Sequence, residues 1–406
     1  MPKIRKEDKL PLRLKQLGKI YRLIEQFEEI SRIDLSKLSR LAPATITALT
    51  RELIKEKLIV ERAVQNTESR GRPAIGLCVS PFYWQSLCAT LIENKFEIIL
   101  SELDGVAIKH VAYPLNSEDL TNLDNVLTQH LESFLEEAKH ECNHIITFSV
   151  AVGGVLDHQK NRLLKLGETE LDIDLKALFS PYFKTPILIT EYFQTWLLAE
   201  STLGSVINCD NVLFLQLDNG INFSVLSKGE LLTNRFQVRS RIGKMYVPKH
   251  NELQDLISLD IPNDERYQLR NQITHRAIYP LIKHFYPETN KLDSTEKIRF
   301  LCEKANNGDE TAQQIIFHIA DSLAYILMNL VNIFGSEKIM LNASYLGSKD
   351  LFLTRLNKQL QLYLADTYTN VEVLTGKYEW NSPVIAASAI KQSIYDGSLL
   401  GHFIRS

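Results

Sequence analysis

The chain has 406 residues, a formal net charge of −3 and five cysteines that form no Cys-x-x-Cys pair. This length predicts two or three domains, and the scattered cysteines argue against a disulfide framework or a structural zinc site. The sequence shows neither an apolar run of about 18 residues nor a secretory signal, so we expect a cytoplasmic protein that does not contact the membrane.

The charge is unevenly divided along the chain. Residues 1–80 hold 17 Lys and Arg against 10 Asp and Glu, a charge of +7, whereas the remainder holds 29 against 39, a charge of −10. Basic surfaces bind polyanions because they release condensed counterions. This uneven charge therefore indicates that the N-terminal part binds nucleic acid, whereas the acidic remainder does not bind it.

Two helix patterns open the N-terminal part. Residues 12–27 repeat apolar side chains at three- and four-residue spacings, which predicts a first helix with one buried side. Ser31 offers an N-cap oxygen to a short second helix. The apolar side of this second helix is expected to consist of Ile33, Leu35 and Leu38.

A third helix follows closely. Pro43 suits the first turn of a helix that we expect from Ala44 to about Lys57. Small residues at its leading end would allow close approach to the major groove of DNA, and hydroxyls and a cation would contact bases or phosphates. The alternative is an ordinary surface helix that these residues cap and solubilise. The residues expected to face outward are Ala44, Thr45, Thr47, Ala48 and Arg51.

Residues 59–79 contain two β-like runs around a polar turn, with Arg70-Gly71-Arg72-Pro73 near its tip or returning arm. Arginines on such an arm can enter a narrow minor groove or pair with phosphates. We predict a winged helix-turn-helix that binds double-stranded DNA, with a protein-docking module of similar shape as the alternative. The predicted DNA contacts are Arg32, Ala44, Thr45, Thr47, Arg51, Arg70 and Arg72.

Four stretches resemble the ROK family (repressors, open reading frames, kinases), in particular its Mlc and NagC type of sugar-responsive repressor. They are YRLIEQ, SRIDLSKLSRLAPATIT, RGRPAIGL and YDGSLL. The resemblance implies an α/β protein, with a winged helix-turn-helix at residues 1–80 and an actin-like (ribonuclease H-like), two-lobed sensor at residues 81–406. The lobes would span about 81–190 with 383–406, and about 191–382. It also implies assembly into homodimers or homotetramers.

The remaining pattern of the chain is compatible with that architecture. A meander of strands followed by alternating helices and strands predicts a mixed sheet with helical cover. We expect strands at 87–92, 96–103, 107–113, 145–150, 185–190, 212–217, 222–227, 230–233 and 338–344, and helices at 120–140, 193–203 and 311–334.

The resemblance also implies that a ROK kinase would need glycine-rich phosphate loops and a general base. This sequence departs from that pattern. The first hairpin has no glycine-rich phosphate loop, and only Gly220 remains of the second glycine cluster. Tyr192 occupies the position of the family's general base, and the neighbouring Glu191 is either a displaced base or a carboxylate that stabilises the helix dipole. We therefore expect no enzyme and no cofactor, with a ROK sugar kinase carrying an accessory head as the alternative.

The family's zinc and sugar residues are also replaced. Lys244 follows Gly243 where the family has a zinc-binding His, and no cysteine occurs between Gly243 and Cys302, so we expect no metal. Arg241 stands where the family has a sugar-binding Glu. Cations near it, at positions 235, 239, 241 and 244, would suit a phosphorylated or carboxylated effector, or form a solvated basic loop.

One part of the family's sugar site persists as Gly154-x-x-Asp157, although this aspartate can equally bond its own backbone in a turn. The candidate effector pocket consists of Gly154, Asp157, Glu191, Tyr192 and Arg241. Its ligand would be a sugar or a sugar phosphate, unless a protein partner controls the molecule or sensing has been lost.

The sequence thus predicts a sequence-specific transcriptional regulator, a repressor of carbohydrate uptake or metabolism genes. A two-fold dimer would bind an inverted-repeat operator, because the symmetry of the protein matches that of the DNA. A DNA-free oligomeric scaffold is the remaining alternative.

Overall fold

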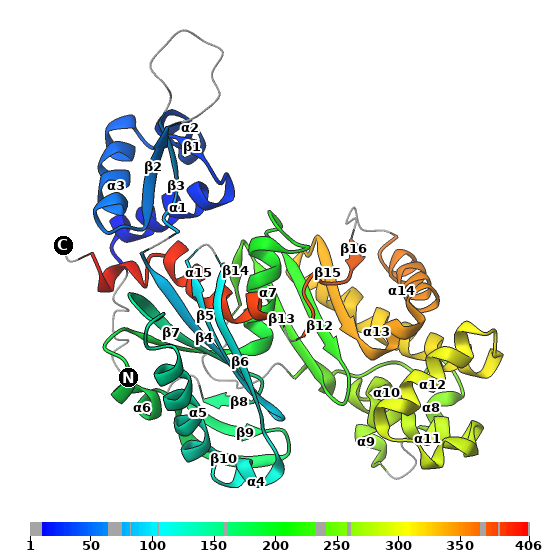
Figure 1. The fold of residues 1–406 in the computed structure, drawn as a ribbon. Helices are drawn as coiled ribbons and strands as arrows, with labels where there is room; N and C mark the ends of the chain where they lie inside the picture. Colours follow the sequence, from blue (N-terminus) through cyan, green and yellow to red (C-terminus); the bar gives the residue numbers. More distant parts are fainter. Residues whose placement is uncertain are drawn as a thin grey trace, which may run out of the picture. The chain divides into compact units, whose positions relative to one another are not determined.

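The computed structural model describes residues 10–63, 75–81, 83–103, 105–157, 161–232, 241–257, 261–365, 371–380 and 382–404 (Figure 1). The chain divides into two units by its internal contacts. Unit 1 comprises residues 1–199 and 380–406, and unit 2 comprises residues 200–379.

The N-terminal part of unit 1, which we call the head, spans the described residues up to position 80 and combines three helices with a small antiparallel sheet of order β1-β3-β2. Apolar residues of all three helices are fully buried around Ile20, Leu35 and Leu49. This arrangement is a winged helix-turn-helix, as predicted. Its elements are α1 (Leu12–Gln26), β1 (Ile30–Ser31), α2 (Arg32–Ser39), α3 (Pro43–Lys55), β2 (Ile59–Ala63) and β3 (Ile75–Val79).

The second helix differs from the expectation. Ser31 caps it as predicted, because its hydroxyl oxygen accepts a hydrogen bond from the Asp34 amide at 3.1 Å. Of the three residues expected on its apolar side, however, only Leu35 is buried, whereas Ile33 and Leu38 are 70% and 48% exposed. The prediction was wrong because the buried face of this helix runs through Leu35 and Ser39, which are four residues apart, and Ile33, two residues from Leu35, points to another side.

The rest of unit 1 is built on a five-stranded mixed sheet of order β11-β7-β4-β5-β6. The meander β4-β5-β6 is antiparallel, and β7 and β11 add parallel strands beside β4. Alternate residues of β4 point to opposite faces, so Leu87 packs in the cluster with α5 and Cys88 in the cluster with α15. The strands are β4 (Gln85–Ile92), β5 (Lys95–Glu102), β6 (Ala107–Pro114), β7 (Ile145–Val152) and β11 (Ile187–Glu191).

Shorter elements complete unit 1. A separate antiparallel sheet has the order β10-β9-β8. The remaining elements are α4 (Ser117–Thr121), α5 (Leu123–Glu137), β8 (Val155–Asp157), β9 (Arg162–Leu166), β10 (Thr169–Asp174), α6 (Leu175–Phe179), η1 (Ser180–Tyr182), α7 (Tyr192–Leu203), α15 (Pro383–Tyr395) and η5 (Leu400–His402).

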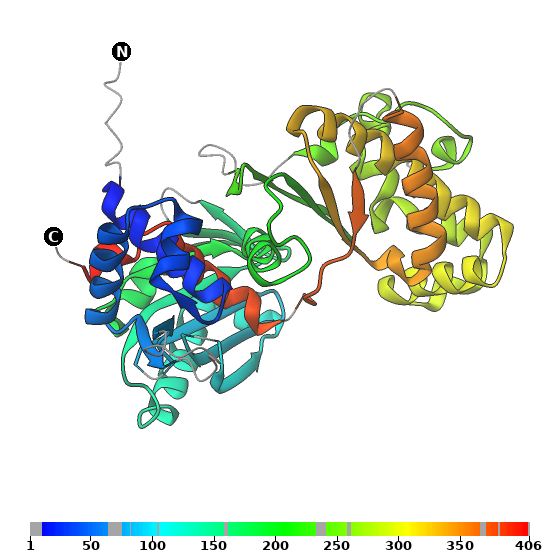
Figure 2. The ribbon, with the colours of Figure 1, turned by 90° about the horizontal axis from the view of Figure 1, so that it is seen from above.

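Helix α15 joins the head to the large sheet of unit 1. It contacts β4, β7 and β11 and also packs along α1, and the two helices lie side by side in both views (Figures 1 and 2). Glu25 of α1 accepts a hydrogen bond from Lys391 Nζ at 2.6 Å and another from the Tyr395 hydroxyl. Gly18 is required at the crossing, because a Cβ there would collide with the Tyr395 carbonyl.

Unit 2 contains a second five-stranded sheet, of order β14-β13-β12-β15-β16. An antiparallel meander is again followed by two parallel strands beside its first strand, so both large sheets share one topology. The strands are β12 (Val212–Leu217), β13 (Ile221–Ser227), β14 (Glu230–Leu231), β15 (Lys338–Ala343) and β16 (Glu372–Leu374).

Helices surround this second sheet, and the longest, α13, is its core helix. Its 25 residues are apolar enough to cross a membrane by composition, but 67% of that apolar window is buried inside unit 2. The helices are η2 (Ile242–Lys244), α8 (Leu253–Leu256), α9 (Asn263–Arg266), α10 (Arg270–Ile273), α11 (His275–Phe285), η3 (Pro287–Lys291), α12 (Ser294–Asn306), α13 (Glu310–Phe334), η4 (Ser344–Ser348) and α14 (Lys349–Tyr363).

The predicted order of strands and helices is confirmed for both large sheets. One correction concerns the helix expected at 120–140, which is divided at Asn122 into α4 and α5. The third helix of the head ends at Lys55, two residues before the expected end, because Lys57 adopts a left-handed conformation with φ of 59°.

Candidate nucleic-acid interface and effector site

Helix α3 presents the outer face that the sequence predicted. Ile46, Leu49 and Leu53 are buried in the head. On the opposite side Ala44, Thr47, Ala48 and Arg51 are exposed, and Thr45 is half-buried. The apolar periodicity of α3 produces this division, because residues three and four apart share one face of a helix. Small side chains and hydroxyls therefore cover the surface of the helix.

The exposed hydroxyl of Thr47 is already a donor within the helix. Thr47 Oγ1 lies 3.0 Å from the Pro43 carbonyl oxygen and donates to it. Its lone pairs remain directed away from that bond, so an approaching ligand would meet Thr47 as an acceptor. Groups that could donate to it include the exocyclic amines of adenine and cytosine in the major groove.

Arg32 lies inside the head's own network of polar contacts. Its Nε donates to Thr50 Oγ1 at 3.0 Å, and its Nη2 lies 2.6 Å from Glu61 Oε1. The side chain is 28% exposed. Arg32 thus joins the start of α2 to α3 and β2, whereas the exposed side chain of Arg51 makes no hydrogen bond or ion pair to any other described residue.

The structure adds cations that the sequence analysis did not single out. Arg40 is exposed in the turn between α2 and α3, where its φ of 59° closes α2 in a left-handed conformation. Lys37 is exposed on α2 beside Asp34, at 3.3 Å, and Lys55 is exposed at the end of α3. Their position in or next to the two helices of the helix-turn-helix could have identified these cations from the sequence. Phosphate contacts at such helix ends fix the orientation of a protein on DNA.

The wing is described only at its base. Strands β2 and β3 pair antiparallel from Ile59 with Val79 to Ala63 with Ile75. Arg70 and Arg72, the predicted minor-groove or phosphate contacts, lie outside the described residues.

Two of the candidate effector residues meet at one edge of the sheet in unit 1. Glu191 ends β11 and pairs with Val152 at the end of β7, so Gly154 follows β7 at the same edge. Gly154 has a packing role, because a Cβ there would collide with the Lys165 carbonyl of β9. Asp157 lies at the end of β8, opposite Arg162.

Tyr192 is a buried side chain, only 1% exposed. Its hydroxyl donates to the Trp380 carbonyl, and the two ring centroids lie 4.7 Å apart. Burial, with a smaller contribution from Glu97, raises the pKa of Tyr192 above its usual value. A neutral, enclosed phenol of this kind positions the segment that leads into α15.

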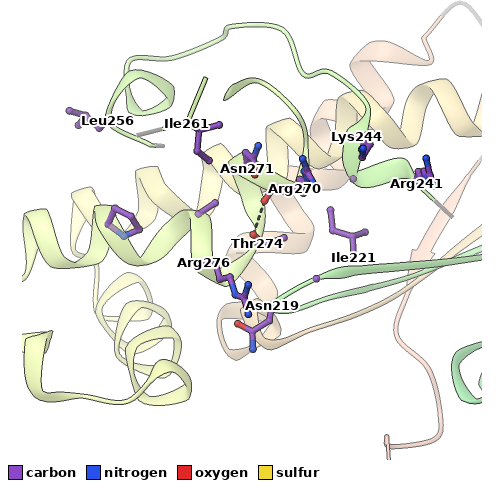
Figure 3. Close-up of a pocket in the computed structure, with 14 residues that line it drawn as sticks. Asn219, Ile221, Arg241, Lys244, Leu256, Ile261, Arg270, Asn271, Thr274 and Arg276 are labelled. Carbon is purple, nitrogen blue, oxygen red and sulfur yellow. Dashed lines mark hydrogen bonds between the residues drawn. The ribbon is translucent and has the colours of Figure 1, made fainter. Parts of the chain in front are cut away.

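Arg241 belongs to unit 2, where it lines a pocket of about 700 Å³ (Figure 3). Among the described residues, the pocket lining includes the cations Arg241, Lys244, Arg270 and Arg276 and no carboxylate. Gly154, Asp157, Glu191 and Tyr192 do not line it. The predicted effector residues are therefore divided between the two units, and the sequence analysis missed two of the four arginines and lysines of this pocket.

Two buried histidines of unit 2, His275 and His318, have partners within the unit. His318 is 1% exposed and stacks on His250 with centroids 5.2 Å apart. Burial and the neighbouring His250 lower the pKa of His318 to about 3. His275 Nε2 lies 3.7 Å from Asp218 Oδ1. Among the described residues, no three His, Cys, Asp or Glu side chains are grouped as metal ligands.

Comparison with known proteins agrees with this architecture. The chain is 25% identical over 397 residues to the DNA-binding transcriptional repressor Mlc of Escherichia coli (strain K12), covering 94% of each protein. It is 23% identical over 397 residues to the N-acetylglucosamine repressor of Escherichia coli O6:H1, covering 97% of each.

A crystal structure described as a ROK family transcriptional regulator, homolog of the E. coli Mlc protein, superimposes with a TM-score of 0.79 at 24% identity, covering 96% of this chain and 98% of that one. Residues 92–394 match the ROK family as a whole. This match covers more than half of the chain, so the chain belongs to the ROK family.

Proposed function

We propose that the protein is a sequence-specific, DNA-binding transcriptional repressor that acts in the cytoplasm as a homodimer or homotetramer. The observation that carries the proposal is the outer face of α3, where Ala44, Thr47 and Arg51 are exposed on a winged helix-turn-helix. The repressor names of the two full-length relatives support it. We place DNA binding in residues 1–80 and effector sensing in residues 81–406.

Two heads related by a two-fold axis would bind the half-sites of an inverted repeat. Helix α3 would enter the major groove, with Thr45, Thr47 and Arg51 reaching base edges or phosphates. Arg40 and Lys37 would hold the adjacent backbone, and Arg70 and Arg72 of the wing are the proposed contacts to phosphates or the minor groove.

Regulation of carbohydrate genes is the proposed role, since one relative is named for N-acetylglucosamine. We propose no catalytic activity, no cofactor and no zinc. Tyr192, in the position of the family's general base, is enclosed and bonded to Trp380. A coupled assay with ATP and hexoses tests this part, because steady turnover by the purified protein would establish a sugar kinase instead.

The main experiment selects binding sequences from a random duplex pool and then measures affinity by fluorescence anisotropy. The wild-type protein is expected to bind a selected inverted repeat about 10³-fold or more tightly than random duplex at physiological salt. Thr47→Val should change the preferred base at one position of each half-site, because it removes the hydroxyl acceptor.

Arg40→Ala should instead weaken binding to all duplexes and reduce the slope of log affinity against log salt by about one. The matched control is Lys358→Ala, which removes an exposed cation of α14 in unit 2 and should change neither property. Equal affinity of the wild-type protein for selected and random duplexes would exclude sequence-specific binding.

A further inference from the structure

A cluster of aromatic side chains lies where the head joins the large sheet of unit 1. Residues 80–84 connect β3 to β4, and Trp84 immediately precedes β4. The Trp84 ring contacts those of Tyr83, His144 and Phe403, with centroids 5.2, 6.2 and 5.1 Å away. Tyr83 and His144 also stack on each other, with centroids 4.1 Å apart. We call these four residues the junction cluster.

The junction cluster contacts the C-terminal end of α3. Trp84 Nε1 donates to the carbonyl oxygen of Glu56, the C-cap of α3, at 2.8 Å. The last carbonyls of a helix lack partners within it, so a side-chain donor satisfies one of them here. Lys57 follows with a positive φ, and its Nζ lies 3.8 Å from the Tyr83 ring centroid in a cation–π contact. Two consecutive residues at the end of α3 thus contact two consecutive residues that precede β4.

The other side of the junction cluster is bonded into the sheet. Gln85, the first residue of β4, donates its backbone amide to the His144 carbonyl at 2.9 Å. Its buried side chain also bonds to the segment before β7: Nε2 donates to the Glu141 carbonyl at 2.9 Å, and Oε1 accepts from the Asn143 amide at 2.8 Å. Trp84 is therefore attached to a hydrogen-bonded end of the sheet.

The head has two separate attachments to the rest of unit 1. One is the contact of α1 with α15, which includes the bond between Glu25 and Lys391. The other is the bond from Trp84 to Glu56 at the end of α3. A body held at one contact can rotate about it, whereas two contacts on different helices oppose that rotation. The second attachment thus defines the direction of α3, and binding surfaces of defined geometry lose less entropy when they bind.

We propose that Trp84 is a positioning residue for DNA binding, because its indole fixes the direction in which α3 is presented. In a two-fold dimer this direction sets the spacing of half-sites that both heads can occupy together. This inference rests on the proposed function. The alternative is that Trp84 only fills space, in which case an apolar ring without a donor would serve as well.

Operators of altered spacing test this role. The selected inverted repeat is prepared with one or two base pairs added or removed between its half-sites, and affinity is measured by fluorescence anisotropy. One added base pair turns the half-sites by about 35° relative to each other. The wild-type protein should lose about tenfold or more in affinity at the altered spacings, because fixed heads cannot engage both half-sites.

Trp84→Ala should flatten this dependence on spacing. It should bind the original operator about tenfold more weakly, since the dimer loses the bond in both heads. At altered spacings it should lose less than about threefold further, because freed heads can follow the half-sites. Its base preference should match that of the wild type, since the outer face of α3 is unchanged. An affinity loss that is equal at every spacing, with the wild-type dependence kept, would assign Trp84 to stability alone and overturn the proposal.

Two further variants separate the donor from the ring. Trp84→Phe keeps an aromatic ring in the junction cluster but removes the indole N–H, and it should flatten the dependence on spacing partly. A wild-type dependence in Trp84→Phe would overturn the role of the bond to Glu56. The matched control Tyr246→Phe removes one side-chain donor to a backbone carbonyl, that of Asp264, in unit 2. It should leave both affinity and the dependence on spacing unchanged.

A measurement without DNA separates this inference from the proposed function. Spin labels attached through Lys37→Cys in α2 and Glu136→Cys in α5, both at exposed positions, report the distance between the head and the rest of unit 1 by double electron–electron resonance. The partly exposed Cys142 and Cys209 are first replaced by serine in the full chain.

The distance distribution should be narrow in the wild-type background and measurably wider with Trp84→Ala. If Trp84→Ala does not fold, the same comparison is made with Trp84→Phe. An unchanged width would overturn the positioning role even if the protein binds its operator. Conversely, a wider distribution in a protein that shows no sequence-specific DNA binding would support the hold of Trp84 on α3 and refute the repressor.

Discussion

The contact between α1 and α15 gives the strongest prediction about stability. Glu25 and Lys391 form an ion pair at 2.6 Å, and their side chains are only 12% and 11% exposed. Lys391→Met keeps most of the side-chain volume but removes the ammonium group. The Glu25 carboxylate then remains enclosed and still accepts a hydrogen bond from the Tyr395 hydroxyl.

The expected cost follows from burial. Removing one partner of a buried ion pair typically destabilises by about 3–5 kcal/mol, because the other charge stays desolvated. Both side chains here keep about a tenth of their exposure. We therefore take the lower end, about 3 kcal/mol. The double variant Glu25→Gln with Lys391→Met removes both charges and should recover most of this loss.

Hydrogen exchange read by mass spectrometry can localise the effect, which matters because a chain with two units need not unfold in one step. Amides of α1 should exchange about a hundredfold faster in Lys391→Met, since each 1.4 kcal/mol corresponds to about a factor of ten. Amides of α13 should be unchanged. The control Arg299→Met breaks two surface pairs, with Glu296 and Glu303, whose side chains are 41% and 66% exposed while that of Arg299 is 69% exposed, and it should cost less than about 1 kcal/mol. Equal effects of the two single variants on α1 would refute the reasoning.

Three further predictions concern other contacts. Gly18→Ala should accelerate exchange in α1 without altering unit 2, because its Cβ would displace the Tyr395 carbonyl; unchanged exchange in α1 would contradict this packing. Arg32→Ala removes the hydrogen bonds to Thr50 and Glu61 and should therefore lower the urea midpoint of unfolding, measured by a signal that reports on the head alone. A loss of DNA affinity without a change in this midpoint would instead assign Arg32 to the DNA interface. For His318, the unfolded chain takes up a proton near pH 6.5 while the folded protein does so only at about pH 3, so stability should fall by about 1.4 kcal/mol per unit as pH drops below about 6.5. In His318→Gln the acid-side slope in urea titrations should become shallower than in the wild type, while His130 and His275, whose pKa values burial also lowers, keep part of it; a slope equal to that of the wild type would exclude His318 as a source.

Strong periodicity made much of the fold predictable. Helix α13 repeats apolar residues through 25 positions, and β4 and β5 are buried along nearly their whole length. The separate sheet β10-β9-β8 was missed because its strands have only three to six residues and because β10 (TELDID) contains three carboxylates, a residue type that is depleted in strands. Strand β16 has only three residues, too few to show any period.

The sequence could predict a candidate site only where all of its residues lie in one continuous segment of the chain. The outer face of α3 follows from its own period. In contrast, the partners of Arg32 lie 18 and 29 residues away, and no local pattern indicates them. Arg270 and Arg276 join Arg241 in the pocket only because α10 packs beside η2 and is itself packed against α11. Contacts of this kind depend on the tertiary fold.

The pairing of α1 with α15 also sets an order of events during synthesis. Glu25 and Lys391 are 366 positions apart. At about 5–20 residues per second, a ribosome needs on the order of 20 to 70 s to translate the intervening chain. During that period α15 has not yet been synthesised, so α1 has no partner on this side. Ile24 and Tyr21 of α1 therefore lack the apolar contacts that α15 supplies in the folded protein. Chaperone binding during translation should therefore be concentrated on this waiting segment.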